Sequence, residues 1–287
     1  ELSQAHAWGD RQIRRNGYPP AQGEPPKHLH YDLWLGPAPF HPYSPDYFRG
    51  GPGANCLSWN MYWDFGSGQI GDMGSHTMDL VWNAIDPVLP TTAQAESYPF
   101  GSQQAGNEKG KPGEPIPPHP EVTPVECHSS FAMPANGWRP AIKVNWWQGG
   151  MMPRTPRGYV DLNRTGHGAM FKGKNGFLVC DFGSRILIPS GDADDMTNYK
   201  PRTKEQLQPR VAGFQREWLV ACKDPKQKTH CDFDYSGTMI ETMLLGHVAY
   251  RAGKKITYDP EKGVVTDNAE ANGLLSRKYR EGWTLNG

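Results

Sequence analysis

Two Asn-Gly dipeptides, each set between runs of alternating apolar and polar residues, constrain the fold of this chain more than any other feature. Asn136-Gly137 separates residues 126–133 from 141–147, and Asn175-Gly176 separates residues 168–171 from 177–182. Asn-Gly readily adopts the left-handed backbone that tight turns between antiparallel strands require. The sequence therefore predicts two β-hairpins, and with them an antiparallel sheet.

Helical periodicity surrounds these hairpins. Apolar residues at helical spacing predict a helix over residues 75–85, which Asp86-Pro87 ends. Further helices are expected at residues 31–39 (a short turn), 210–222, 238–251 and 269–279, and further strands at 4–8, 92–98 and 255–259. Residues 40–70 and 100–120 are expected to be long loops. We therefore expect one α+β domain over residues 1–287, with a large, open, mostly antiparallel sheet and helices on one side.

Composition excludes several classes of function. Thirty basic residues balance thirty acidic ones, and no basic stripe with interleaved aromatic residues is present, so nucleic acid is not an expected partner. No apolar run approaches the roughly 20 residues of a membrane span. The five cysteines are scattered and never spaced as CxxC, which favours buried, reduced thiols. His28 and His30 form an HxH pair without a nearby acidic residue, and no metal site is expected.

The segment 66–79 carries the clearest chemistry. It contains a formal GxGxxG at residues 66–71, but the preceding run is not a buried parallel strand, and Asp72 would occupy the place of a pyrophosphate. We interpret the glycines as a loop that lets backbone approach a ligand or another domain.

Asp72 and His76 are four residues apart, so a helix that includes both presents them on one face. A carboxylate beside an imidazole orients the ring and suits a general base that takes a proton from an alcohol. Asp79 is either a second orienting group or an acid favoured by the helix dipole. The alternative is structural: Asp72 or Ser75 caps the helix, and His76 is an ordinary polar residue.

This segment resembles the glycine-rich loop and Asp-x-x-x-His motif that open the second domain of Gfo/Idh/MocA oxidoreductases. The resemblance extends, in order, to the subgroup from polysaccharide-degrading bacteria at residues 30–39, 168–176, 233–237, 241–246, 270–272 and 279–283. It implies that Asp72 and His76 handle the proton when a hydride leaves a sugar or polyol carbon for NAD or NADP.

The same resemblance implies that the cofactor is held by an N-terminal Rossmann domain. This chain contains neither its glycine loop nor its Glu-Lys-Pro, and Glu108-Lys109-Gly110 is not a substitute. We expect that the Rossmann domain is missing, that the cofactor-binding residues lie mostly in it, and that this chain alone is inactive. Its partners would be a sugar or polyol, the Rossmann domain, and further copies of itself through the sheet face, where Ile142, Val144 and Trp146 are compatible apolar residues. An exported, periplasmic or cytoplasmic location is equally compatible.

Aromatic rings stack on sugar CH surfaces, and arginine forks bind hydroxyls or carboxylates. On this basis five residues are substrate-binding candidates: Arg49, Trp63, Trp147, Arg154 and His167. The family resemblance adds Tyr235, which resembles a position near the active-site loops of family members. Each has an ordinary structural alternative, such as a core position for Trp147 or a solvated loop charge for Arg154. Two other functions remain open. One is an NAD-dependent glycosidase that oxidises its sugar transiently, and the other is a non-catalytic binding or oligomerisation domain.

Overall fold

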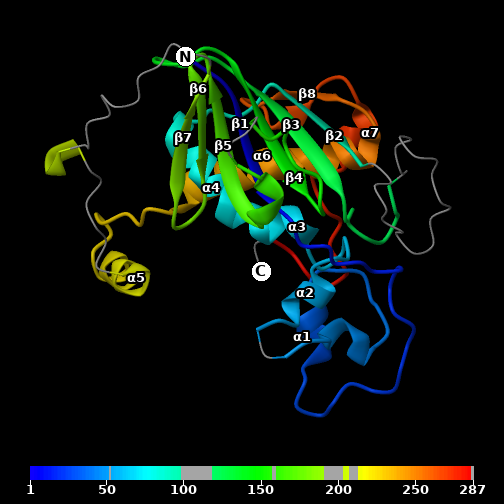
Figure 1. Ribbon diagram of the computed structural model, residues 1–287. Helices are drawn as coiled ribbons and strands as arrows, with labels where there is room; N and C mark the ends of the chain where they lie inside the picture. Colours follow the sequence, from blue (N-terminus) through cyan, green and yellow to red (C-terminus); the bar gives the residue numbers. More distant parts are fainter. Residues whose placement is uncertain (52, 98–117, 157–159, 191–202, 207–212, 286–287) are drawn as a thin grey trace.

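The computed structural model describes residues 1–287 apart from 52, 98–117, 157–159, 191–202, 207–212 and 286–287. A nine-stranded sheet runs through it in the order β7-β6-β5-β1-β4-β3-β2-β8-β9 (Figure 1). The strands are β1 (Leu2–Gly9), β2 (Thr92–Glu96), β3 (Cys127–Met133), β4 (Ile142–Gln148), β5 (His167–Gly173), β6 (Gly176–Cys180), β7 (Arg185–Pro189), β8 (Ile256–Asp259) and β9 (Val264–Val265). Each pairing between them is antiparallel except that of β1 with β4. The expected mostly antiparallel α+β sheet is confirmed.

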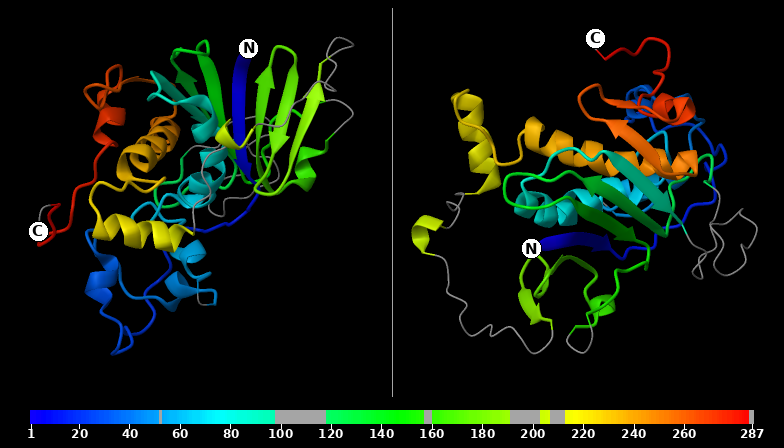
Figure 2. Two further views of the ribbon diagram at one scale, coloured as in Figure 1. Left: turned by 90° about the vertical axis from the view of Figure 1, so that its left-hand side faces the viewer. Right: turned by 90° about the horizontal axis from the view of Figure 1, so that it is seen from above.

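Two long helices cover one face of this sheet, as the views in Figure 2 show. They are α4 (Met73–Ile85) and α6 (Phe233–Ala252). α6 approaches closely at Gly246, where an added Cβ would lie 2.7 Å from the Ser129 hydroxyl on β3. The main core lies between these helices and the sheet, and its largest fully buried side chains include Trp82, Phe131 and Trp146. The other helices are α1 (Tyr31–Leu35), α2 (Cys56–Trp59), α3 (Gly68–Gly71), α5 (Phe214–Lys223) and α7 (Ala269–Gly273).

Strand β1 lies in the middle of the sheet and is covered on both faces, by the core beneath the helices on one side and by the apolar group that contains Trp8 on the other. Ala5 and Ala7 face the helices and are fully buried, and their small size lets α4 pack closely. Gly9 ends the strand at a tight contact, where an added Cβ would lie 3.1 Å from the Cβ of Met73. The end of β1 therefore lies beside the start of α4, although more than sixty residues separate them in the sequence.

The expectation that Ile142, Val144 and Trp146 lie on the exposed sheet face is wrong. All three are buried in the core beneath the helices. The opposite face carries a different apolar group, formed by Trp8, Leu162, Met170, Val179 and Ile188. Alternation with a period of two shows that one face of a strand is buried, but it does not show which one.

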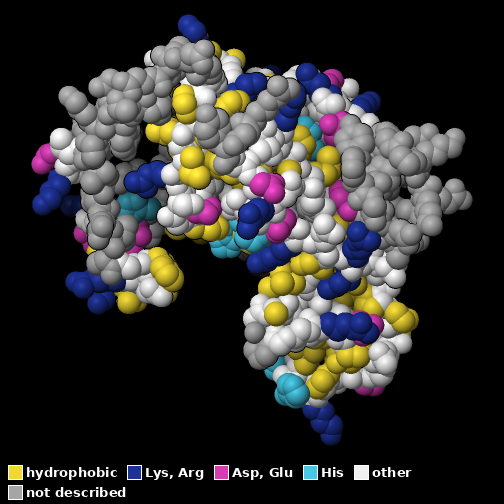
Figure 3. All heavy atoms as spheres, in the orientation of Figure 1, with side chains coloured by type: hydrophobic (Ala, Val, Ile, Leu, Met, Phe, Trp, Pro, Cys, Tyr) yellow, Lys and Arg dark blue, Asp and Glu magenta, His cyan; other side chains and the backbone are white. Residues whose placement is uncertain are grey.

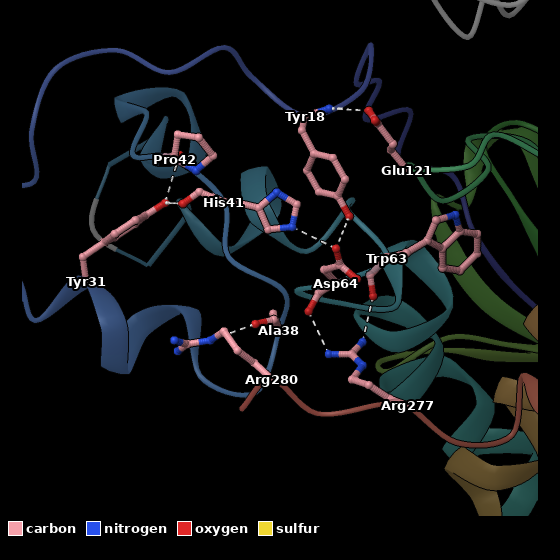
Figure 4. Close-up of polar contacts among 10 residues, drawn as sticks. All are labelled: Tyr18, Tyr31, Ala38, His41, Pro42, Trp63, Asp64, Glu121, Arg277 and Arg280. Atoms are coloured by element: carbon pink, nitrogen blue, oxygen red, sulfur yellow. Dashed lines mark hydrogen bonds and ion pairs between the residues drawn. The ribbon is translucent and has the colours of Figure 1, made fainter. Parts of the chain in front are cut away.

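Residues expected to be irregular form an aromatic lobe below the sheet, which we define as residues 11–66 (Figure 1). At its centre the carboxylate of Asp64 accepts hydrogen bonds from Tyr18 (2.7 Å) and His41 (2.9 Å), as Figure 4 shows. The bond from His41 lowers the pKa of Asp64, and burial raises the pKa of Tyr18. Near the C-terminus, Arg277 and Arg280 hold this lobe by donating to its backbone carbonyls.

Several element boundaries differ from the expected ones. The helix expected over residues 269–279 ends at Gly273, and β7 and β9 were not anticipated. The start of the helix expected over residues 210–222 and most of the loop at 100–120 lie outside the described residues. All five cysteines are free, but the expectation that they are buried is correct only for Cys127. Cys56 and Cys180 are partly exposed, and Cys222 and Cys231 are exposed. Within the described residues, no helix is long and apolar enough to cross a bilayer.

Candidate functional site

The glycines of residues 66–71 are required by packing within this chain. An added Cβ at Gly66 would lie 2.1 Å from Oδ1 of Asn60, and at Gly68 it would lie 2.3 Å from Oγ1 of Thr123. Gly68 also has a φ of +57°, the left-handed region that favours glycine. The loop therefore folds against its own neighbours, which supports the rejection of a dinucleotide-binding fingerprint.

Asp72 takes the N-cap position of α4, but its side chain accepts no hydrogen bond from the helix backbone. Ser75 instead donates its hydroxyl to the Asp72 carbonyl, at 2.7 Å. The carboxylate of Asp72 is therefore available to a distant residue, and it forms an ion pair of 2.7 Å with Nη1 of Arg11. The structural alternative, in which this carboxylate caps the helix, is not what the structure shows.

His76 lies one turn further along α4 and is exposed. It has no hydrogen-bond or ion-pair partner among the described residues. Asp79 follows one turn later and accepts a hydrogen bond of 2.5 Å from the Tyr235 hydroxyl at the start of α6. Burial and this carboxylate raise the pKa of Tyr235, which keeps the phenol protonated. Along α4, His76 therefore follows Asp72, which Arg11 holds, and precedes Asp79, which Tyr235 holds.

The ends of the neighbouring strands β1 and β5 bring two further polar groups close to the start of α4. Asp10 follows β1, and His167 begins β5, with 4.0 Å between the carboxylate and the imidazole Nδ1. Both lie beside Gly9, and Gly9 packs against Met73, the residue that follows Asp72 in the sequence. We call Arg11, Asp72, His76, Asp79 and Tyr235 the Asp72 cluster, with Asp10 and His167 at its margin.

This cluster lies on an accessible side of the molecule. In Figure 1, α3 and the start of α4 lie at the lower side of the sheet, above the aromatic lobe. The space-filling view in the same orientation shows acidic, basic and histidine side chains at the surface of this region (Figure 3). The side chains of Arg11 and Asp72 keep 37% and 22% of their surface exposed, so the cluster is not part of the packed interior.

The other candidates from the sequence do not meet at this cluster. Trp147 lies on the far face of the sheet, stacked on His128 with 3.7 Å between ring centroids. Arg49 pairs with Asp46 in the aromatic lobe, at 2.9 Å. Trp63 packs against α6, and Arg154 is exposed in a loop. Among the sequence candidates, Asp72 and His76 stand at the start of α4, His167 lies beside Gly9 near this helix start, and Tyr235 reaches Asp79 further along α4, whereas Arg49, Trp63 and Trp147 make their contacts elsewhere.

Arg11 is the residue that sequence reasoning missed. It stands two positions after the end of β1 and 61 residues before Asp72, so no spacing rule connects them. The only sequence signal for Arg11 was its position shortly after a predicted strand, since residues at strand ends often lie near the starts of helices.

The arrangement can bind and deprotonate a hydroxyl group. A neutral imidazole can accept the proton, and the guanidinium that Asp72 holds can donate to a second ligand oxygen. The nearby carboxylates can orient the ring or the ligand, and their interactions with Arg11 and Tyr235 fix their positions.

Comparison with known proteins adds a family to this geometry. Residues 14–94, which include the Asp72–His76 segment, match a Gfo/Idh/MocA family model described as "Oxidoreductase family, C-terminal alpha/beta domain". No curated protein matches the sequence.

Similar solved structures include an NAD-binding protein from Listeria innocua (11% identity, TM-score 0.44) and the WlbA dehydrogenase from Bordetella pertussis in complex with NADH and UDP-GlcNAcA (9%, 0.45). Each match covers 90% of this chain and 55% of the other. A levoglucosan dehydrogenase is 13% identical with a TM-score of 0.35, over 89% of this chain and 58% of that one. The chain thus spans little more than half the length of these proteins. Over residues 14–94, it is similar to the C-terminal domain of the Gfo/Idh/MocA oxidoreductases.

Proposed function

We propose that this chain is the C-terminal, substrate-binding part of an NAD(P)-dependent oxidoreductase of the Gfo/Idh/MocA type, acting on a sugar or polyol hydroxyl. The observation that supports this most is the partly exposed Asp72 cluster, of which Asp72, His76 and Asp79 lie inside the segment that matches the family model. A second domain would supply the nicotinamide, which accepts the hydride from the substrate carbon.

In this proposal His76 takes the proton of the reacting hydroxyl. Its ring is exposed and free of partners among the described residues, so a substrate oxygen can reach it. Asp72 and Asp79 lie one turn before and one turn after it and stabilise the imidazolium that forms.

Arg11 and Tyr235 act on the two carboxylates. Arg11 holds the Asp72 carboxylate in place, and it can donate a second hydrogen bond to a neighbouring substrate hydroxyl. Tyr235 fixes Asp79 in the same way.

His167 at the margin of the cluster is a further substrate contact in this proposal. Roles for Arg49, Trp63, Trp147 and Arg154 in binding substrate stay predictions. Self-association through the sheet also stays a proposal, and it would not use Val144 and Trp146, which are buried in the core.

The test uses the complete protein, expressed from its full coding sequence and supplied with NAD or NADP and a panel of sugars. Replacing His76→Gln should lower kcat/KM by about 10²- to 10⁴-fold, the usual contribution of a general base. Because His76 is exposed, the urea midpoint of unfolding should not move. His28→Gln, in an exposed loop position far from α4, is the matched control.

Accumulation of reduced nicotinamide separates a dehydrogenase from a glycosidase that oxidises its sugar only transiently. If His76→Gln retains activity within threefold of the unchanged protein, the assignment of the proton transfer to this cluster is wrong.

A further inference from the structure

A cavity of 390 Å³ lies in the aromatic lobe, and none of the residues in the Asp72 cluster lines it. Three separate segments build its wall: residues 14–20, the turn that contains Asp46 and Arg49, and Tyr62. The first segment is held in place at Tyr18, whose backbone N–H donates to Glu121 at 2.8 Å and whose hydroxyl donates to Asp64, as Figure 4 shows. The cavity is therefore formed by parts of the chain that the fold fixes.

The wall carries more positive than negative charge. Arg14, Arg15 and Arg49 line the cavity, together with one acidic residue, Asp46. The charge of Asp46 is already paired, because its Oδ1 accepts a hydrogen bond of 2.9 Å from Nε of Arg49. The wall therefore favours an anionic ligand.

Arg15 is a cation that backbone carbonyls hold. Its guanidinium donates to the carbonyls of Arg14, Leu57 and Ser58 and to the Ser58 hydroxyl, at 2.7–3.3 Å. An arginine has five N–H groups, so one, on Nη1, is left for a ligand. No described carboxylate lies within ion-pair distance of Arg15, whereas Arg14 lies 3.7 Å from the buried carboxylate of Glu126. The charge of Arg15 is thus fixed in position without a counter-charge.

Tyr62 supplies a hydroxyl without a partner. The residue is only 3% exposed, and its ring stacks on Tyr18 with 5.2 Å between the ring centroids. Among the described residues its hydroxyl has no hydrogen-bond partner, and it is not one of the polar atoms that are closed off from the surface. Burial raises the pKa of Tyr62, which keeps the phenol protonated and able to donate.

This hydroxyl lies at the cavity. The charges of Arg15, Asp46 and Arg49 act on it, and all three residues belong to the cavity wall. A donor on a buried residue without an acceptor is costly, and a ligand oxygen in the cavity would satisfy it.

We infer that this cavity binds a phosphate group, either free or at the end of a small ester, with one oxygen accepting from the Tyr62 hydroxyl and another from Nη1 of Arg15. The two donors come from separate segments and approach a ligand from different sides. A tetrahedral phosphate presents oxygens in several directions, whereas a carboxylate presents two in one plane. The inference goes beyond the proposed function and does not depend on hydride transfer.

Inorganic phosphate is the probe, added to the chain as it is in a buffer without phosphate or sulfate. Calorimetric titration and phosphorus NMR line broadening should show binding with a Kd of about 1 mM. Acetate, which is planar, should bind at least tenfold more weakly. Glycerol 3-phosphate distinguishes the two sources of the group: tighter binding than that of inorganic phosphate assigns the cavity to esters, and weaker binding assigns it to the free ion.

Variants locate the binding. Tyr62→Phe removes only a hydroxyl that has no partner to lose, so it should fold, and it should weaken phosphate at least tenfold. Tyr279→Phe, outside the cavity, is the matched control. Arg15→Met should also weaken phosphate at least tenfold, and its urea midpoint shows whether losing the contacts with residues 57–58 disturbs the fold; if it does, Tyr62→Phe alone decides. His76→Gln should leave phosphate binding unchanged, whether or not the proposed dehydrogenase function is correct.

Three results would overturn the inference. They are the absence of phosphate binding, equal binding of acetate, and phosphate binding that Tyr62→Phe leaves unchanged, which would mean an adventitious ion only.

Discussion

The stability of this protein should fall steeply between pH 7.5 and pH 4.5 because two histidines are buried in the neutral form. Burial is the main cause that lowers the pKa of both His6 and His247 from 6.5 to about 4. For His6, the neighbouring His128 and Lys172 add to the effect. The geometry agrees, since Nδ1 of His6 accepts a hydrogen bond of 3.1 Å from the Trp147 indole and must be unprotonated to do so.

The sign and size of this effect follow from proton linkage. Between pH 6.5 and pH 4 the unfolded chain binds more protons than the folded one, so stability is lost as the pH falls. Relative to pH 7.5, each histidine costs about 1 kcal/mol at pH 5.5 and about 2–3 kcal/mol at pH 4.5. Together they remove about 5 kcal/mol, a large part of the 5–15 kcal/mol that a domain usually has.

Urea unfolding followed by tryptophan fluorescence at a series of pH values measures this loss. His247→Gln can keep a donor for the Ser67 carbonyl, which accepts from Nε2 of His247, and His6→Asn can keep an acceptor for the Trp147 indole. Each variant should remove about half of the pH dependence, while His28→Gln should leave it intact. Asp64, whose pKa is lowered, should add to the loss only below about pH 4. A full pH dependence retained in both His247→Gln and His6→Asn would refute the reasoning.

Two further predictions concern stability. Gly149→Ala should lower the free energy of unfolding by about 2–4 kcal/mol, because Gly149 has a φ of +69° and an added Cβ would lie 2.1 Å from the Val125 carbonyl oxygen. The control is Gly137→Ala, where an added Cβ meets nothing within 4 Å. Equal effects of the two substitutions in urea unfolding would contradict this prediction. Arg280→Met should lower the free energy of unfolding by about 2 kcal/mol, because the guanidinium donates hydrogen bonds to Asp32 and to the Ala38 and Gly36 carbonyls. The control is Lys278→Met, at a neighbouring exposed position. Protease digestion should show earlier cleavage within residues 11–66 only in the Arg280 variant.

Local sequence patterns were sufficient for most of the elements. Asn136-Gly137 and Asn175-Gly176 each lie between strands that pair antiparallel, as expected, although the first connection is longer than a tight turn. The apolar spacing before Asp86 gave the helix now seen as α4. Elements without a strong pattern were not predicted correctly. Strand β7 was missed because it is mostly exposed and has no clear apolar alternation. The helix expected over residues 269–279 was too long, because Leu274 and Leu275 line a cavity instead of continuing α7.

The motif at residues 66–76 was also readable from the chain, because its glycines and its Asp-x-x-x-His spacing are local. Its surroundings were not. Asp72 could have capped its own helix, and only the tertiary structure shows that Arg11 holds it instead.

The sequence by itself determined the types of the main elements, the antiparallel hairpins and the place of the Asp72–His76 pair, since all of these depend on residues a few positions apart. Only the tertiary structure decided the partner of Asp72, the parallel pairing of β1 with β4, the buried face of β4 and the cavity that Arg15 and Tyr62 line. Each of these depends on residues that are distant in the chain, and a hydrophobic period of two or 3.6 residues carries no information about which distant surface will cover an apolar face.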